Sequence, residues 1–133
     1  MSWKTELVDY VNSRKEMPFE WGVNDCMLFL AGGVKIKSGD DHAPDFTHKS
    51  AKEAFAYTKG DVDSFIDGFG YERVHVNLAQ FGDAVTSHKI GEKGRSLGGI
   101  CMGANSYFIA EHGAVHIPTI QCDVAWRIPV GGV

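Results

Sequence analysis

The chain has 133 residues, of which 44% are hydrophobic and 23% are charged, and its formal net charge at pH 7 is -4. This length suits a single domain, expected to span 1–133, that buries enough surface to fold without disulfides or a metal. The acidic balance argues against a nucleic-acid partner, and no stretch reaches the roughly 18 apolar residues of a membrane span. The start of the chain lacks the apolar segment of a signal peptide. Three cysteines without a CxxC pair favour reduced thiols in a bacterial or viral cytosolic setting, and neither a metal site nor another cofactor is expected.

The first part of the sequence predicts two helices separated by a short loop. Apolar residues recur at helical spacing over 3–15, which predicts an amphipathic helix that ends before Pro18. A second, more apolar helix is expected from about Asp25 to Lys37, and the Gly32-Gly33 pair weakens it.

Two shorter helices are expected after a polar surface loop at 38–48. Ser50 and Glu53 form a capping box, which predicts a helix that ends at Gly60. A further helix of one or two turns is expected before Gly68. The residues expected to cap it are Asp61 or Asp63.

From Tyr71 onward the apolar pattern changes from helical spacing to alternation, which is typical of strands. Glycine and asparagine turns separate the apolar runs, so an antiparallel meander is expected. The expected strands cover residues 74–78, 84–86, 98–102, 107–110, 114–117 and 124–128. For 74–78, a loop is the alternative. Helices first and strands second predict an α+β fold in which one face of the sheet takes the helices and the other can meet solvent.

The loop at 18–24 delivers Cys26 into the first turn of the second helix. Asn24 is expected to be the N-cap, and the free backbone N–H groups and helix dipole would then favour a thiolate. Cys26 can therefore be a nucleophile, and the alternative is a small buried hydrophobe. Asp25 is expected to complement the helix dipole and Trp21 to anchor the loop, and each could also contact a substrate.

Two motifs give the chain a resemblance to a known superfamily. Residues 21–29, Trp-Gly-Val-Asn-Asp-Cys-Met-Leu-Phe, look like the nucleophile motif of the NlpC-type, papain-like cell-wall peptidases, and 81–85, Phe-Gly-Asp-Ala-Val, look like their first core strand. A phage-encoded, tail-associated branch of that superfamily is more similar still, because it shares the phrases at 99–103, Gly-Ile-Cys-Met-Gly, and 125–128, Ala-Trp-Arg-Ile. The resemblance covers roughly 15–129 and implies a papain-like fold.

The resemblance also implies which positions should carry the chemistry. Peptidases of this kind need a thiolate, a histidine that transfers the proton and a polar group that orients the imidazole. Cys26 matches the nucleophile, but the family's histidine position falls on Leu97 and its orienting position on Ala110. Two of the three functional positions therefore depart from the pattern.

Two histidines are the candidates to replace the missing base. His88 follows the Gly-Asp strand and His116 alternates with apolar residues on a later strand, and for both the alternative is a half-exposed strand histidine without a role in a site. His75, between Val74 and Val76, is a strand histidine of the same kind with the same alternative, and His42, His48 and His112 are expected to lie on the surface.

Three functions follow as hypotheses. The first is a phage tail-assembly or tail-tip component with a degenerate catalytic site, found in the bacterial cytoplasm during assembly and then in the virion tail, with phage tail proteins as partners. The second is an active cysteine hydrolase that attacks a peptidoglycan-like peptide with Cys26, with His88 or His116 as base and with Trp21, Asn24 and Asp25 as substrate-binding residues. The third is a peptide- or small-molecule-binding module.

Overall fold

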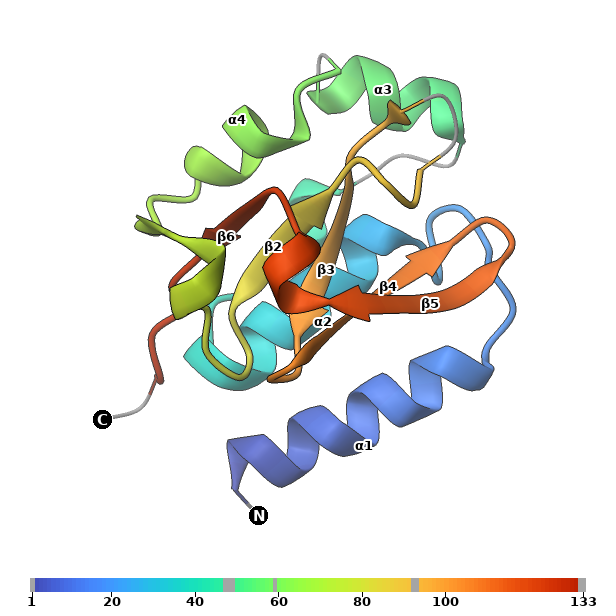
Figure 1. Ribbon diagram of the computed structural model, residues 1–133. Coiled ribbons are helices and arrows are strands. Elements are labelled where there is room, and N and C mark those ends of the chain that lie inside the picture. The colour runs from blue at the N-terminus through green and yellow to red at the C-terminus, as the bar shows by residue number, and fades with distance from the viewer. Residues whose placement is uncertain (1, 47–49, 59, 92–93, 132–133) are drawn as a thin grey trace.

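A computed structural model describes residues 2–46, 50–58, 60–91 and 94–131 (Figure 1). Within these residues the fold is α+β, with four α-helices and one six-stranded antiparallel sheet in the order β1-β6-β2-β3-β4-β5. The helices are α1 (Trp3–Glu16), α2 (Cys26–Ser38), α3 (Ala51–Thr58) and α4 (Val62–Asp67). The strands are β1 (Arg73–Val74), β2 (Ala84–Ser87), β3 (Leu97–Cys101), β4 (Asn105–Ala110), β5 (Gly113–Pro118) and β6 (Val124–Trp126). The expected α+β class is confirmed.

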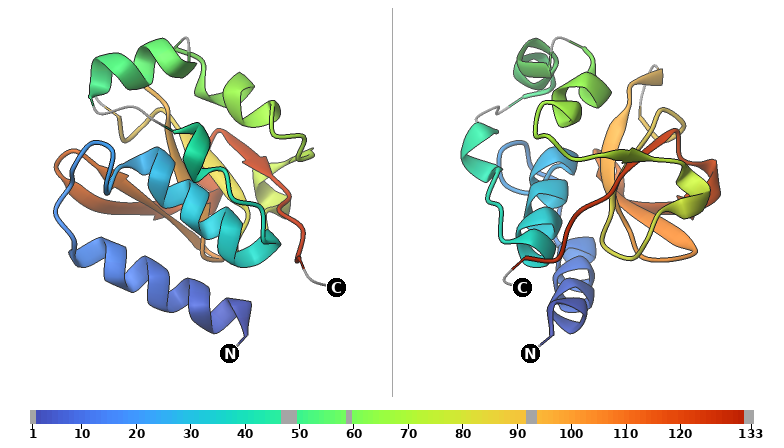
Figure 2. Two further views of the ribbon diagram at one scale, coloured as in Figure 1. Left: turned by 180° about the vertical axis from the view of Figure 1, so that it is seen from behind. Right: turned by 90° about the vertical axis from the view of Figure 1, so that its left-hand side faces the viewer.

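The main core lies between the helices and one face of the sheet. Helix α2 lies against that face and α1 packs beside it, as the two views in Figure 2 show. Leu7 of α1 and Phe29 of α2 are buried in this layer. The Gly32-Gly33 pair allows close packing, because a Cβ atom at Gly33 would overlap the side chain of Ile100 on β3.

The opposite face of the sheet is also buried, so the expectation that it meets solvent is wrong. Two 3₁₀ helices, η2 (Val76–Leu78) and η4 (Thr119–Gln121), fold back over it and contact each other. They and the neighbouring segments cover a second apolar cluster. Its buried members are Val85, Cys101, Phe108, Cys122 and Ala125.

The strand expected at 74–78 is wrong beyond Val74. The His75 side chain instead accepts a hydrogen bond from the Asn77 backbone N–H at 3.1 Å and caps η2. This local side-chain bond replaces the strand ladder. The last strand is also shorter than expected, because β6 ends at Trp126.

The loop expected at the surface in 38–48 is not wholly exposed. Phe46 is buried and packs against Phe65 and Phe69, with ring centroids 5.5 and 6.0 Å away. The loop also contains a third 3₁₀ helix, η1 (Ala43–Asp45). His48 lies outside the described residues, as do Glu92 and Lys93 of the loop before β3.

The two short helices begin as expected. The Glu53 backbone N–H donates to Ser50 Oγ at 3.1 Å, which confirms the first half of the capping box, and the Ser64 N–H donates to Asp61 at the start of α4. In Figure 1 both helices lie near the ends of β2 and β3. None of the described helices is long and apolar enough to cross a membrane.

Candidate functional site

The loop between α1 and α2 is held by one buried side chain. Asn24 is fully buried, and its Nδ2 group donates to the carbonyl oxygens of Met17 and Pro18 at 3.2 and 3.3 Å. Asn24 also forms an isolated β-bridge with Glu20. Asn24 therefore shapes the loop, and it lines neither of the cavities described below.

The N-cap of α2 is Asp25, so the assignment of that role to Asn24 is wrong. The Asp25 carboxylate accepts the backbone N–H groups of Met27 and Leu28 at 3.1 and 3.0 Å. Its second oxygen accepts the N–H of Gly22 at 2.8 Å, and Gly22 has the positive φ that this turn requires. The Asp25 side chain is fully buried and is used to build the helix start.

Cys26 follows this cap as the first residue of α2 and is only 7% exposed. The pKa of its thiol is raised to about 12, because burial removes water from the thiolate and because the Asp25 carboxylate lies nearby. The backbone N–H groups of Gly98, Met27 and Cys26 itself lower the pKa in part. The expectation that the helix start favours the thiolate is wrong in direction, since desolvation outweighs the N–H groups and the thiol stays protonated at neutral pH.

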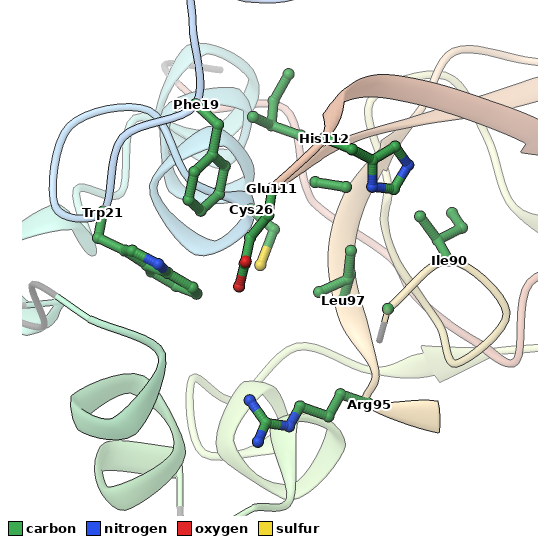
Figure 3. A pocket seen from close by; sticks show the side chains of 11 residues that line it. Phe19, Trp21, Cys26, Ile90, Arg95, Leu97, Glu111 and His112 are labelled. Carbon is green, nitrogen blue, oxygen red and sulfur yellow. The ribbon is translucent and has the colours of Figure 1, made fainter. Parts of the chain in front are cut away.

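Two cavities meet at Cys26, and together we call them the Cys26 cleft. The first has a volume of about 280 Å³ and is drawn in Figure 3, and the second has a volume of about 270 Å³. Both are lined by Trp21, Cys26, Arg95 and Leu97. The residues that line only the first are Phe19, Ile90, Gly91, Ile109, Ala110, Glu111 and His112. Those that line only the second are Met27, Ala54, Thr58, Gly60, Val62, Gly94 and Ser96.

The three positions that the family resemblance marks for catalysis all line the first cavity. Leu97 begins β3 and Ala110 ends β4, and both face the same space as Cys26. Both are apolar, so neither can take a proton from the thiol or orient an imidazole.

Neither of the histidines expected to replace the base lines the Cys26 cleft. The imidazole of His88 is paired with Asp123 instead, with 2.6 Å between Nδ1 and Oδ2. His116 is exposed on β5, with its ring 5.2 Å from that of Tyr107. His88 follows the end of β2 and His116 lies on β5, and neither position belongs to the lining of the cleft.

Three charged or titratable side chains at the cleft were not assigned to it from the sequence: Glu111 and Arg95 were not singled out, and His112 was expected to lie on the surface. Glu111 and His112 follow Ala110 in the turn between β4 and β5, and Arg95 precedes β3. Figure 3 shows the Glu111 carboxylate pointing into the first cavity, and His112 also belongs to the lining of that cavity. Their positions in the sequence could have indicated this, because Glu111 and His112 directly follow Ala110 and Arg95 lies two residues before Leu97. Residues that flank a strand end at a cleft are expected at the edge of that cleft.

A metal centre has no support in this part of the molecule. Among the described residues, no three or more His, Cys, Asp or Glu side chains are grouped so that they could hold a metal ion. The titratable or charged groups that line the cleft are one protonated thiol, the Glu111 carboxylate, the Arg95 guanidinium and the His112 imidazole, and most of the remaining wall is apolar.

Comparison with known proteins gives a family without a described activity. No curated protein shows a significant match to the chain. One family model matches residues 1–128, which include every element from α1 to β6 and the whole of the Cys26 cleft. The chain belongs to the family described as Domain of unknown function (DUF6950).

Proposed function

We propose that this chain is a non-catalytic member of the phage-encoded, NlpC-type branch of the papain-like superfamily, and that it acts as a tail-assembly or tail-tip component. Its Cys26 cleft, in this proposal, holds a segment of a partner protein. The observation that carries the proposal is the apolar pair Leu97 and Ala110, which lines the same cavity as Cys26. The resemblance to the NlpC-type peptidases marks Leu97 as the position of the proton-transferring histidine and Ala110 as that of the group that orients it.

The chemistry of the cleft supports binding over hydrolysis. A cysteine hydrolase needs a thiolate and a base in hydrogen-bond reach of it. The pKa of Cys26 is raised to about 12, and within the described residues no hydrogen bond joins its sulfur to an imidazole. Loss of the base alone lowers the rate of such enzymes by orders of magnitude.

The order of the elements supports the assignment to the superfamily. A helix with a cysteine in its first turn is followed by two short helices and then by the antiparallel strands β2, β3 and β4. The cysteine faces the start of β3 and the end of β4. This is the arrangement that the resemblance implies, and phage tail proteins are accordingly the proposed partners, met in the bacterial cytoplasm during assembly.

The test compares two substitutions in a phage that carries this gene. Cys26→Ala removes the thiol, and Leu97→Trp fills the cleft. The proposal expects normal plaque formation from Cys26→Ala and defective tails from Leu97→Trp, scored by electron microscopy. Loss of infectivity from Cys26→Ala, with the protein folded and present at normal level, would contradict it.

An active cysteine hydrolase is the second candidate, and one observation favours it. His112 lines the same cavity as Cys26, and the backbone N–H groups of Cys26, Met27 and Gly98 already point at the sulfur. Release of soluble fragments from purified peptidoglycan by the wild-type protein, lost in both Cys26→Ala and His112→Ala, would establish this function. No release by the wild-type protein at high enzyme concentration is the result that the first proposal expects.

A further inference from the structure

One carboxylate in the Cys26 cleft is available to a ligand. Glu111 lies in the turn after β4, is exposed, and directs its carboxylate into the first cavity (Figure 3). Within the described part of the chain, this carboxylate has neither a hydrogen bond nor an ion pair. A carboxylate that points into a cavity without a protein partner favours a cationic group there.

Aromatic rings line the same cavity. Phe19 and Trp21 belong to the loop before α2, and their rings meet edge to face with centroids 4.9 Å apart. Aromatic rings attract ammonium and guanidinium groups through the negative charge of their faces. Rings and a carboxylate around one space form a suitable environment for a lysine or arginine head group.

The wall between these groups is apolar. Leu97, Ile109 and Ala110 line the first cavity, and such a surface suits the methylene stem of a long basic side chain. Among the described residues that line either cavity, Glu111 is the only acidic one, so a bound cation is placed at Glu111.

We propose that the Cys26 cleft binds a partner segment that carries a lysine or arginine, with the cation at Glu111 and the side-chain stem over Leu97. This inference rests on the proposed function of the cleft as a binding site and adds the charge of the partner. The formal net charge of -4 on the chain is complementary to a basic segment and assists its approach.

Isothermal titration calorimetry with two synthetic peptides tests the proposal. Both are N-acetylated and C-amidated, one with the sequence Ala-Ala-Lys-Ala-Ala and the other Ala-Ala-Glu-Ala-Ala. The wild-type protein should bind the lysine peptide up to about tenfold more tightly than the glutamate peptide, because Glu111 is exposed and its attraction of one charge and its repulsion of the other are each worth up to about 1 kcal/mol. Glu111→Gln should remove most of this preference, and Glu111→Lys should reverse it.

Two further variants separate the failure of this inference from the failure of the proposed function. Glu6→Gln, at an exposed position on α1 that does not line the cleft, is the matched control and should leave both affinities unchanged. Leu97→Trp should abolish binding of both peptides. If Glu111→Gln binds the lysine peptide as tightly as the wild type while Leu97→Trp does not bind, the cation site is overturned and the cleft remains a binding site. If the wild type binds neither peptide, or Leu97→Trp binds both as tightly as the wild type, both proposals are overturned.

Discussion

Cys26 occupies a helix start, where free N–H groups and the helix dipole stabilise a thiolate, yet its thiol is held protonated. The sequence showed the helix start and the polar residues before it, but not the depth at which the fold buries the sulfur. The Asp25 carboxylate is a neighbour in sequence, but Gly98 of β3 reaches the sulfur only in the folded chain. The desolvation that decides the pKa of Cys26 comes from the burial of its sulfur, which depends on how the folded chain closes around it.

The first prediction concerns the pH dependence of stability. The pKa of Cys26 in the folded chain is raised to about 12, so the folded state holds the thiol proton more tightly than the unfolded state. The resulting contribution to the free energy of unfolding is fully present below the ordinary thiol pKa and is lost as the pH rises toward 12. The wild-type free energy of unfolding should therefore fall by up to about 1.4 kcal/mol per pH unit more than that of Cys26→Ala between pH 9 and 11. Urea denaturation of both proteins at half-unit intervals measures this difference.

Other groups with raised pKa values titrate in the same range and remain in both proteins. The pKa of Tyr10 and that of Tyr71 are raised to about 12, and the pKa of Cys122 is raised to about 11, in each case chiefly by burial. Their effect cancels in the difference between the two proteins. Parallel curves for wild type and Cys26→Ala would mean that the Cys26 thiol is not desolvated.

The second prediction concerns the cap that positions Cys26. Asp25→Ala removes the acceptor of the Met27 and Leu28 N–H groups and should lower the free energy of unfolding by about 1–2 kcal/mol. Asp25→Asn keeps an acceptor oxygen and should lose less. Asp9→Ala, at an exposed position on α1, is the control and should change stability by less than about 0.5 kcal/mol. An equal, small effect of both Asp25 variants in chemical denaturation would show that Asp25 is not the cap.

At the scale of elements, the four helices were predictable from the sequence, whereas the structure of the segment at 74–78 and of the loop that contains Phe46 was not. The apolar period and the capping residues placed all four helices close to their observed bounds. The segment at 74–78 alternates like a strand, but the His75 imidazole accepts a hydrogen bond from the Asn77 backbone N–H, and the chain forms η2 there. Phe46 stands in a polar loop, and its burial depends on Phe65 and Phe69, which come from a different helix and loop.

The third prediction tests the close contact of α2 with β3. Gly33→Ala improves helix propensity by about 1 kcal/mol, but the new Cβ would overlap the side chain of Ile100. The free energy of unfolding should therefore fall by about 1–2 kcal/mol in total. Ile100→Val removes the overlapping methyl group. Thermal or chemical denaturation of the two single variants and the double variant measures the loss of unfolding free energy in each. The loss in the double variant should be smaller than the sum of the losses in the two single variants. Strictly additive losses would mean that the two residues are not in contact.

At the scale of the whole molecule, one buried carboxylate joins three distant parts of the chain. Asp83 precedes β2 and is fully buried, and it accepts from Lys37 Nζ at 3.2 Å, from Arg127 Nε at 3.0 Å and from the Ile128 backbone N–H at 2.9 Å. Lys37 lies in the last turn of α2, and Arg127 follows β6. The C-terminal end of α2 and the end of β6 are thus fixed at a single residue.

The fourth prediction concerns this residue. Asp83→Asn leaves Lys37 as a buried cation without a counter-charge and should cost about 3–5 kcal/mol. Asp41→Asn is the matched control, because its ion pair with Lys35 is exposed and should be worth less than about 1 kcal/mol. Denaturant midpoints of the two variants provide the comparison, and a similar small effect from both would contradict the structural role of Asp83.

The candidate site was predictable only where the family resemblance supplied positions. The resemblance marked Cys26, Leu97 and Ala110, and the structure brings all three to one cavity. Glu111 and Arg95 were not singled out, since their direction depends on how the turn after β4 and the segment before β3 close around the cleft. The same dependence on the fold explains why His88 lies away from the cleft.

The most direct test of the central claim, a cleft without a catalytic thiolate, is the pH profile of Cys26 alkylation. Iodoacetamide modification of the native protein is followed by mass spectrometry of the proteolytic fragment that contains Cys26, at pH values from 5 to 11. Modification should be slow at pH 7 and its rate should still rise at pH 10, because the pKa of the thiol is raised to about 12. Fast modification with a plateau below pH 8 would show an activated thiolate and would contradict the account.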